Sequence, residues 1–360
     1  MISFFQKNLN LKILIPAIII YFLGLVSIVS TTVGISQNHL IYFFLGLVIF
    51  IGLQLIDVDF FVKYSIYFYG FICFLLILIY IIGHTALGAS RWLKIGELSI
   101  QPSEMAKIAV IFVNTHILLS NGVIKIGKKA YTNKYLKSAM FSLPLIVLVL
   151  LQPDLGTTIA ISLIYFGILL ISNFNKVWFL VAFIVISILS SPLYNSLQDY
   201  QRERILIFIN PESDPYGSGY NSIQAKIAVG SGGIFGKGYK KGTQTQLNFL
   251  PIFWTDFLVA TFAEEWGLIG LMFFISVYLF LIYQIYQIFL NTNIPSYKYI
   301  SFGIMIYFAC QFLINFGMNV GLLPVTGIPV PLFSYGGTSL VSSFILLAII
   351  NKISSDKAKI

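Results

Sequence analysis

Ten apolar runs, each long enough to cross a bilayer, constrain the fold of this chain more than any other feature. A transmembrane helix needs about 20 predominantly apolar residues. The runs cover residues 12–30, 39–57, 62–83, 103–120, 138–153, 155–173, 176–193, 257–290, 299–321 and 337–352. Only 10% of the 360 residues are charged, against about a quarter in a soluble domain. The sequence therefore predicts an all-α integral membrane protein of ten transmembrane helices, forming one domain over 1–360.

The distribution of positive charge predicts the orientation of these helices. The net charge of +9 is spread along the chain, with most cations beside apolar runs on the side that carries the N-terminus. Short outer loops hold only Arg91 and Lys94. Cytoplasmic loops are enriched in lysine and arginine, so both termini are expected in the cytoplasm. This pattern reflects membrane topology and does not indicate binding to nucleic acid.

Residues 194–256 form a long polar segment between the seventh and eighth predicted helices. The topology places this segment outside the cytoplasm. Long loops in a compact domain are usually functional, so chemistry is expected on the outer face.

The first polar stretch on this face is GASRWLKIGELSIQPSEMAK. Glu104 and Lys107 are three residues apart and share one helix face, so they are expected to pair. The pair could be purely structural, or it could line a polar cavity. Arg91 and Trp92 could hold a phosphate and an apolar chain, or could act as an interfacial anchor, with Lys94 a further outer cation.

Two further stretches offer polar groups. In QPDLGTT, Asp154 is either an N-cap or a cavity-lining group. The glycine-rich stretch 210–251 lacks the P-loop pattern, because Ser231 stands where the first glycine should be. Its SIQAKIAVGSGG segment, which includes Lys226, instead predicts an amphipathic helix on the membrane surface, where basic groups meet lipid phosphates.

Three acids open the eighth run, in TDFLVATFAEEWG. With Thr255 as the N-cap, Asp256 lies in the first turn at the water boundary. There it could be a second cap or an ionised general base. Glu264 lies about 12 Å deeper and is expected either to pair with a buried cation such as Lys107 or to have a shifted pKa. Glu265 points about 100° away from Glu264, so the two acids are not expected to share one role.

Near the C-terminus, GLLPVTGIPVPLFSYGGTS interrupts an apolar region with prolines and glycines. Non-helical backbone at membrane depth requires protein or a water-filled cavity around it. The stretch therefore predicts a re-entrant element or a loop that caps a cavity.

Taken together, these stretches resemble the SEDS family (shape, elongation, division and sporulation), in family order and over nearly the whole chain. Within the family, GLLPVTGIPVP is similar to the elongation branch. The resemblance implies a ten-helix protein of the bacterial cytoplasmic (inner) membrane. It also implies a peptidoglycan glycosyltransferase that polymerises lipid II into β-1,4 glycan strands, with Asp256 of TDF as the catalytic residue. The family often has a polar residue and a histidine before TDF, where this chain has Ile252, Phe253 and Trp254.

The remaining expectations concern substrate and partners. Substrate-binding residues expected around Asp256 are Arg91, Trp92, Lys94, Glu104, Lys107, Asp154, Arg202, Lys226, Gln244 and Glu264. No residue cluster specifies a metal, although a divalent cation (Mg²⁺ or Mn²⁺) could assist. Expected partners are lipid II, the nascent glycan strand, membrane lipid, a class B penicillin-binding protein and other elongation-complex proteins. A lipid II flippase, a non-catalytic scaffold and the division paralogue are the alternatives.

Overall fold

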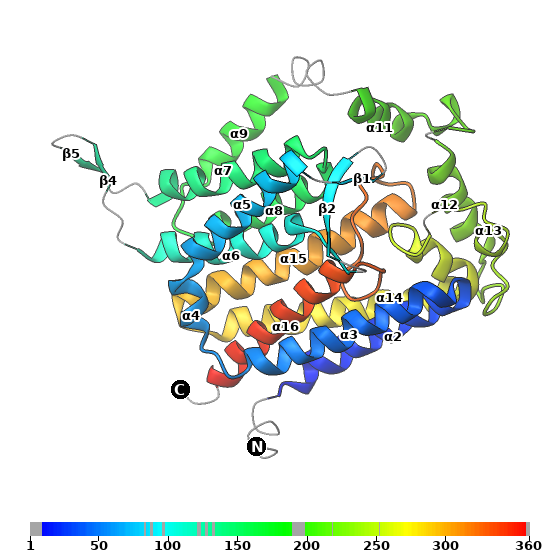
Figure 1. Ribbon diagram of the computed structural model, residues 1–360, viewed down its shortest axis with the longest axis horizontal. Helices are drawn as coiled ribbons and strands as arrows, with labels where there is room; N and C mark the ends of the chain where they lie inside the picture. Colours follow the sequence, from blue (N-terminus) through cyan, green and yellow to red (C-terminus); the bar gives the residue numbers. More distant parts are fainter. Residues whose placement is uncertain are drawn as a thin grey trace.

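The computed structural model describes residues 9–82, 84–86, 89–95, 98–120, 124–126, 129–131, 134–188, 199–217, 219–251 and 253–357. Most of these residues are helical. The long helices pack side by side along one axis of the molecule (Figure 1). Their bounds are α2 (Leu11–Thr31), α3 (Val33–Leu53), α5 (Ser65–Ile82), α6 (Pro102–Leu119), α7 (Lys134–Leu151), α8 (Leu155–Ile171), α9 (Val177–Ile188), α14 (Leu258–Asn291), α15 (Pro295–Asn319) and α16 (Gly337–Lys357). Shorter helices are α4 (Val58–Lys63), α11 (Asp199–Ile209), η1 (Pro211–Ser213), α12 (Tyr220–Ser231) and α13 (Thr243–Gln246).

The helical class predicted from the sequence is confirmed, and each predicted apolar run overlaps one of the ten long helices. Among the described residues, six helices are long and apolar enough to cross a membrane by length and composition: α2, α3, α7, α14, α15 and α16. A tight turn at residues 152–153 joins α7 to α8.

Two short segments between the helices form β-strands, which the sequence analysis did not predict. β1 (His84–Ala86), β2 (Ala89–Ile95) and β3 (Leu98–Ile100) form a three-stranded antiparallel sheet, in the order β1-β2-β3. β4 (Ile124–Ile126) and β5 (Lys129–Tyr131) form a second antiparallel pair. Such short strands lie between helices and carry too few residues for a clear period-2 pattern.

The centre of the bundle is α6, which packs against α5, α7, α8 and α15. Nearly every residue of α6 is buried, including polar residues Glu104, Lys107 and Asn114. A helix buried all round by its neighbours can hold polar groups only where they find partners. Paired polar side chains are therefore expected at the centre of the protein.

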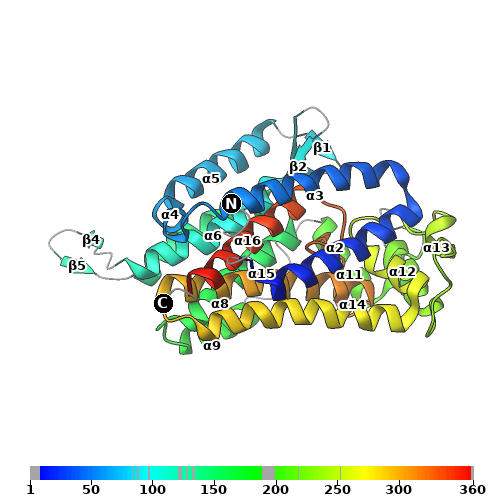
Figure 2. The same cartoon turned by 90° about the horizontal axis from the view of Figure 1, so that it is seen from below.

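Amide side chains join the start of α2 to the ends of α3 and α16. Asn351 Nδ2 donates to Gln54 Oε1 at 2.8 Å, and the backbone N–H of Asn10 donates to Asn351 Oδ1 at 2.8 Å. Gln54 Nε2 also donates to the Ala348 carbonyl at 3.1 Å. The contact holds three helices together through neutral groups. This contact, called here the amide clasp, is formed by Asn10, Gln54 and Asn351. It lies where α2 begins and where α3 and α16 end, and these helix ends point away from α12 and α13 (Figure 2).

Helix α14 is interrupted at Gly267, whose φ of 67° and ψ of −166° are non-helical. A break leaves backbone donors and acceptors without their helical partners. Residues 232–238 form turns rather than a β-strand. This piece of backbone, called here the docking strand, supplies the missing partners. Gly233 and Ile234 carbonyls accept from Leu268 N (2.9 Å) and Ile269 N (3.1 Å).

The docking strand also donates hydrogen bonds to the part of α14 that precedes the break. Lys237 N donates to the Glu264 carbonyl at 2.9 Å, and Gly238 N donates to the Glu265 carbonyl at 3.0 Å. This close approach requires glycine, because a Cβ on Gly236 would lie 2.2 Å from the Glu265 carbonyl oxygen. The glycine-rich stretch is thus a backbone partner for α14, in agreement with the sequence argument against a P-loop.

We predict that Gly267→Ala destabilises the protein strongly. A Cβ there would lie 2.2 Å from Gly236 N, and the positive φ disfavours any L side chain. The expected loss is about 2 kcal/mol or more of unfolding free energy, seen as a lower midpoint in thermal unfolding of the purified protein. Gly70→Ala on α5 is the matched control, because nothing lies within 4 Å of its added Cβ. Equal midpoints for both variants would contradict the packing described.

Candidate active site

Asp256 lies in a turn directly before α14, with its side chain half-buried. The predicted Thr255 N-cap was wrong: α14 begins at Leu258 with Phe257 as its N-cap. The reason is tertiary, because Asn319 Oδ1 of α15 accepts from Ala260 N at 3.1 Å and so provides the acceptor that a local cap would supply. Asp256 therefore precedes the helix and does not lie in its first turn.

Two asparagines of α15 hold the backbone of Asp256. Its carbonyl oxygen accepts from Asn315 Nδ2 at 3.0 Å and from Asn319 Nδ2 at 2.9 Å. Both amides are fully buried, and Asn319 Nδ2 also donates to Asn315 Oδ1 at 3.0 Å. The backbone that carries the carboxylate is consequently fixed by groups outside its own segment.

Sequence reasoning missed these asparagines, although a signal was present. Gln311, Asn315 and Asn319 recur every four residues in the apolar run QFLINFGMN. Residues four apart lie on one helix face, and buried polar groups in an apolar helix are usually functional. This polar stripe of α15 faces the candidate site.

The loop between α15 and α16, residues 320–336, covers the Asp256 turn. Tyr335 N donates to the Trp254 carbonyl at 3.0 Å. Gly327, with φ of 75°, faces the carboxylate: a Cβ built there would lie 3.7 Å from Asp256 Oδ2. The prediction of non-helical backbone within this stretch is confirmed. Of the apolar residues before Asp256, Phe253 is buried and Trp254 half-buried, while Ile252 lies outside the described residues.

The same loop reaches the start of α8, where Asp154 lies. A Cβ on Gly156 would be 2.7 Å from the Thr326 carbonyl oxygen. Asp154 is the N-cap of α8, with Oδ1 accepting from Thr157 N at 3.2 Å. Its Oδ2 accepts from Gln101 Nε2 at 3.2 Å. Asp154 is thus a buried cap that joins α6 and α8 close to the loop over Asp256.

Glu104 and Lys107 form the ion pair expected from their spacing. Lys107 Nζ lies 2.7 Å from Glu104 Oε1 and donates to Gln311 Oε1 at 2.6 Å. The ammonium also lies 5.3 Å from the ring centroid of Tyr307. Both charges are buried, and Glu104 Oε2 has no hydrogen-bond partner in the part of the chain that the structure describes. The pair connects α6 to the polar stripe of α15.

Lys226 lies on α12, whose helical form is as predicted. The opposite face of this helix buries Ala225 and Ala228 with Phe253 and Phe257. The Lys226 side chain lies over Gly321, where an added Cβ would be 1.9 Å from its Cε. This places Lys226 beside the end of α15 that holds Asp256.

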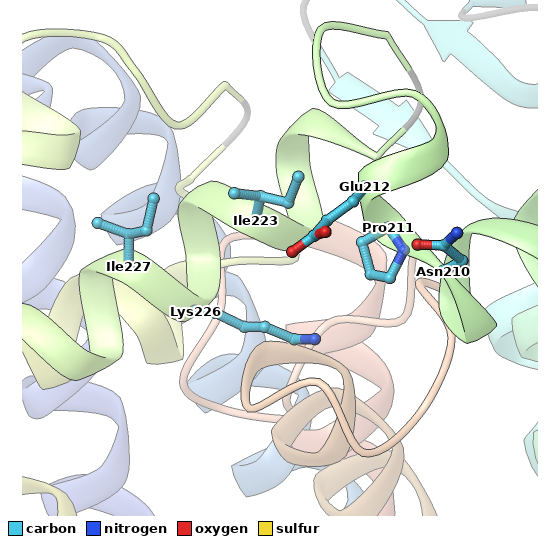
Figure 3. Close-up of a pocket in the computed structure, with 6 residues that line it drawn as sticks. All are labelled: Asn210, Pro211, Glu212, Ile223, Lys226 and Ile227. Atoms are coloured by element: carbon cyan, nitrogen blue, oxygen red, sulfur yellow. The ribbon is translucent and has the colours of Figure 1, made fainter.

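A pocket of about 330 Å³ adjoins Lys226 between α12 and η1. It is lined by Asn210, Pro211, Glu212, Ile223, Lys226 and Ile227. Figure 3 shows the Glu212 carboxylate and the Lys226 side chain entering from opposite sides. The pocket combines both signs of charge with an apolar wall.

Glu264 does not pair with Lys107, contrary to the sequence-based prediction. Its Oε1 lies 2.6 Å from Lys237 Nζ, a lysine of the docking strand. It also accepts from the Gln244 backbone N–H at 3.1 Å. Lys107 already forms its ion pair with Glu104, so Glu264 pairs with a lysine of the loop before α14 instead. Glu265 is buried beside it, with Oε1 accepting from Lys240 N at 3.2 Å.

Four predicted residues stand apart from this network. Arg91 and Lys94 belong to β2, but their side chains lie outside the described part of the structure. Trp92 is half-buried on the same strand, and Arg202 is half-buried on α11. Gln244, by contrast, belongs to the network through its backbone N–H, and its buried side-chain oxygen has no hydrogen-bond partner among the described residues.

A resident metal is not specified by the side chains that the structure describes. Among those residues, no three His, Cys, Asp or Glu side chains converge as a potential metal site.

Fold and site together define a multi-pass membrane protein with one acid held at a helix start beneath a covering loop. The family described as cell cycle protein, FtsW/RodA/SpoVE, matches residues 4–359. The chain belongs to this family.

Relatives with similar sequences include two called peptidoglycan glycosyltransferase MrdB. The protein from Escherichia coli K12 is 36% identical over 86% of this chain and 82% of its own length. The one from Helicobacter pylori 26695 is 34% identical over 94% and 87%. A probable peptidoglycan glycosyltransferase FtsW of Wigglesworthia glossinidia is 33% identical over 88% and 82%.

Solved structures with the same fold include a chain from a study entitled "Structural coordination of polymerization and crosslinking by a peptidoglycan synthase complex". It is 25% identical, with a TM-score of 0.83 and coverage of 98% of this chain and 99% of that one. The rod shape determining protein RodA of Thermus thermophilus has a TM-score of 0.72 at 23% identity and 97% coverage of both chains. The similarity to the Thermus thermophilus protein shows a shared fold.

We predict that Lys107→Met destabilises the protein by about 3–5 kcal/mol, because it leaves the buried Glu104 carboxylate without its cation. The double variant Glu104→Gln, Lys107→Met removes both charges and is expected to recover most of this loss. Thermal unfolding of purified protein checks both. A single variant that unfolds at the wild-type midpoint would contradict the pairing.

Proposed function

We propose that Asp256 is the general base of a peptidoglycan glycosyltransferase that polymerises lipid II during cell elongation. The activity follows from family membership and from the MrdB relatives, which match most of the chain. The assignment of the base is supported by one observation above all. Asp256 is a half-buried acid whose backbone is held by Asn315 and Asn319 while its carboxylate faces the covering loop.

In the proposed reaction, the Asp256 carboxylate accepts the proton of the 4-hydroxyl of the acceptor N-acetylglucosamine. The oxygen attacks the anomeric carbon of the growing strand, which serves as donor. The bond between this carbon and the pyrophosphate oxygen breaks, undecaprenyl pyrophosphate leaves, and the configuration inverts. Pyrophosphate is already a good leaving group, so catalysis depends mainly on alignment and on neutralising charge.

Cations around Asp256 would neutralise the pyrophosphates. Lys226 is the best-supported candidate, because its side chain lies over the end of α15 that holds Asp256. Arg202, Arg91 and Lys94 remain further candidates, and Trp92 could contact the lipid chain.

Buried polar groups below the site would shape the space for the sugar and the lipid. Asp154 and the Glu104–Lys107 pair fix α6, α8 and α15 relative to one another. Glu264 and Gln244 act at the junction between α14 and the loop. All are proposed to serve substrate binding through the geometry they maintain.

The proposed topology has ten transmembrane helices and both termini in the cytoplasm of a bacterial cell, with residues 1–360 forming one domain. Residues 194–256, between α9 and α14, would lie outside the inner membrane. The arrangement supports this: α12 and α13 lie at one end of the bundle, and β4, β5 and the end of α16 at the other (Figures 1 and 2). The lysine-rich connection at β4 and β5 suits the cytoplasmic side.

A class B penicillin-binding protein is the proposed partner, together with other elongation-complex proteins. Its support is the fold shared with a chain from a peptidoglycan synthase complex, whose title joins polymerisation to crosslinking. A transpeptidase would act on the strand as it leaves the outer face.

We predict that Asp256→Asn lowers the rate of lipid II polymerisation by about 10²–10⁴-fold, the usual contribution of a general base. The amide keeps the size of the side chain but cannot accept the proton. The measurement is gel analysis of products from lipid II incubated with purified protein and its penicillin-binding partner.

Asp59→Asn, which makes the same change at an exposed acid of α4, is the control and should retain normal polymerisation. Normal polymer from Asp256→Asn would reject the base. If wild type made no polymer under conditions that support a relative, lipid II transport between leaflets would be the next activity to assay.

A further inference from the structure

The carboxylate of Glu264 is saturated by groups of the outer loop. Its Oε1 accepts from Lys237 Nζ at 2.6 Å and from Thr243 Oγ1 at 3.0 Å, and its Oε2 accepts from Gln244 N at 3.2 Å. Glu264 is fully buried, whereas the Lys237 side chain is 27% exposed. A fully buried carboxylate surrounded by loop donors is not exposed to a substrate group. Its partners all come from the loop, so its role is to bind the loop to α14.

The part of α14 that Glu264 belongs to is a short separate segment. It extends from Leu258 to the break at Gly267, a length of about 14 Å at 1.5 Å per residue. Asp256 lies directly before it. At the outer end, Asn319 holds this segment through Ala260 N. At the inner end, the docking strand holds it, and Glu264 is the charged contact between the two.

The loop side of the same contact leads to Lys226. α12 ends at Ser231, and the docking strand follows without interruption. A Cβ on Gly232 would lie 2.1 Å from the Ala263 carbonyl oxygen, so the strand touches the α14 segment from its first residue. Lys226 and Asp256 are therefore carried by two segments that meet where Lys237 binds Glu264.

We propose that the Lys237–Glu264 ion pair is a positioning contact, which sets the placement of Asp256 relative to Lys226. The proposal rests on Asp256 being the base. Loss of the lysine leaves a buried carboxylate without its cation, and the docking strand must shift to admit water. A misplacement of about 1 Å at reacting groups can cost about 100-fold in rate.

The test compares variants of the full-length protein, assayed with its penicillin-binding partner over a range of lipid II concentrations. Lys237→Ala is expected to lower kcat by about 10- to 100-fold while KM changes by less than about twofold, because positioning acts on the reacting atoms. Lys237→Arg retains a cation and should recover most of the rate. Lys241→Ala is the matched control: it lies in the same loop and, among the described residues, forms no ion pair.

Thermal unfolding of every variant separates positioning from simple loss of folded protein. Glu264→Gln keeps an acceptor for Gln244 N without the charge, and should lower kcat less than Lys237→Ala. The two changes combined should cost no more than Lys237→Ala alone, since both remove one contact.

Three results would overturn the proposal: a rate for Lys237→Ala equal to that of Lys241→Ala, a loss that only tracks the folded fraction, or a raised KM with kcat retained. The Asp256→Asn arm distinguishes this failure from failure of the base. Normal activity in that arm rejects Asp256 whatever Lys237 does, whereas an inactive Asp256→Asn with a fully active Lys237→Ala rejects the positioning contact alone.

Discussion

The constraint on which the packing around α12 and the start of α14 depends is the break in α14 at Gly267. Backbone groups released inside an apolar bundle must find partners, since each unsatisfied group costs several kcal/mol. The docking strand meets this requirement on both sides of the break. The need for backbone contact explains why glycines are concentrated in GSGGIFGKG. It also explains how the polar segment before α14 becomes an integral part of the helical domain.

Buried charges follow the same rule in two separate places. Lys107 is balanced within α6 and by the amide of α15, and Glu264 is balanced by the loop. Asp256 and Glu264, two of the three acids at the start of the eighth run, thus differ in burial. The Asp256 carboxylate is half-buried and faces the loop 320–336, while Glu264 is fully buried among donors from residues 237–244.

Sequence reasoning succeeded where the information was local. The apolar runs marked the helices, and a spacing of three placed Glu104 against Lys107. It failed where a distant segment decided the outcome. Lys237 and Glu264 are 27 residues apart and have no shared periodicity. The start of α14 depends on Asn319, 59 residues beyond Ala260. The stripe of Gln311, Asn315 and Asn319 was readable as a four-residue repeat, yet only packing shows what it holds.

The amide clasp at the other end of the bundle has a different consequence. Asn10, Gln54 and Asn351 carry no net charge, so their hydrogen bonds neither titrate nor move with the transmembrane voltage. Dissolved ions screen the nearby Lys352–Asp57 contact, with its 3.8 Å separation and exposed aspartate, but leave the amides unaffected. The junction of α2, α3 and α16 should therefore keep one geometry across the swings in acidity, salinity and membrane potential that a growing bacterium experiences.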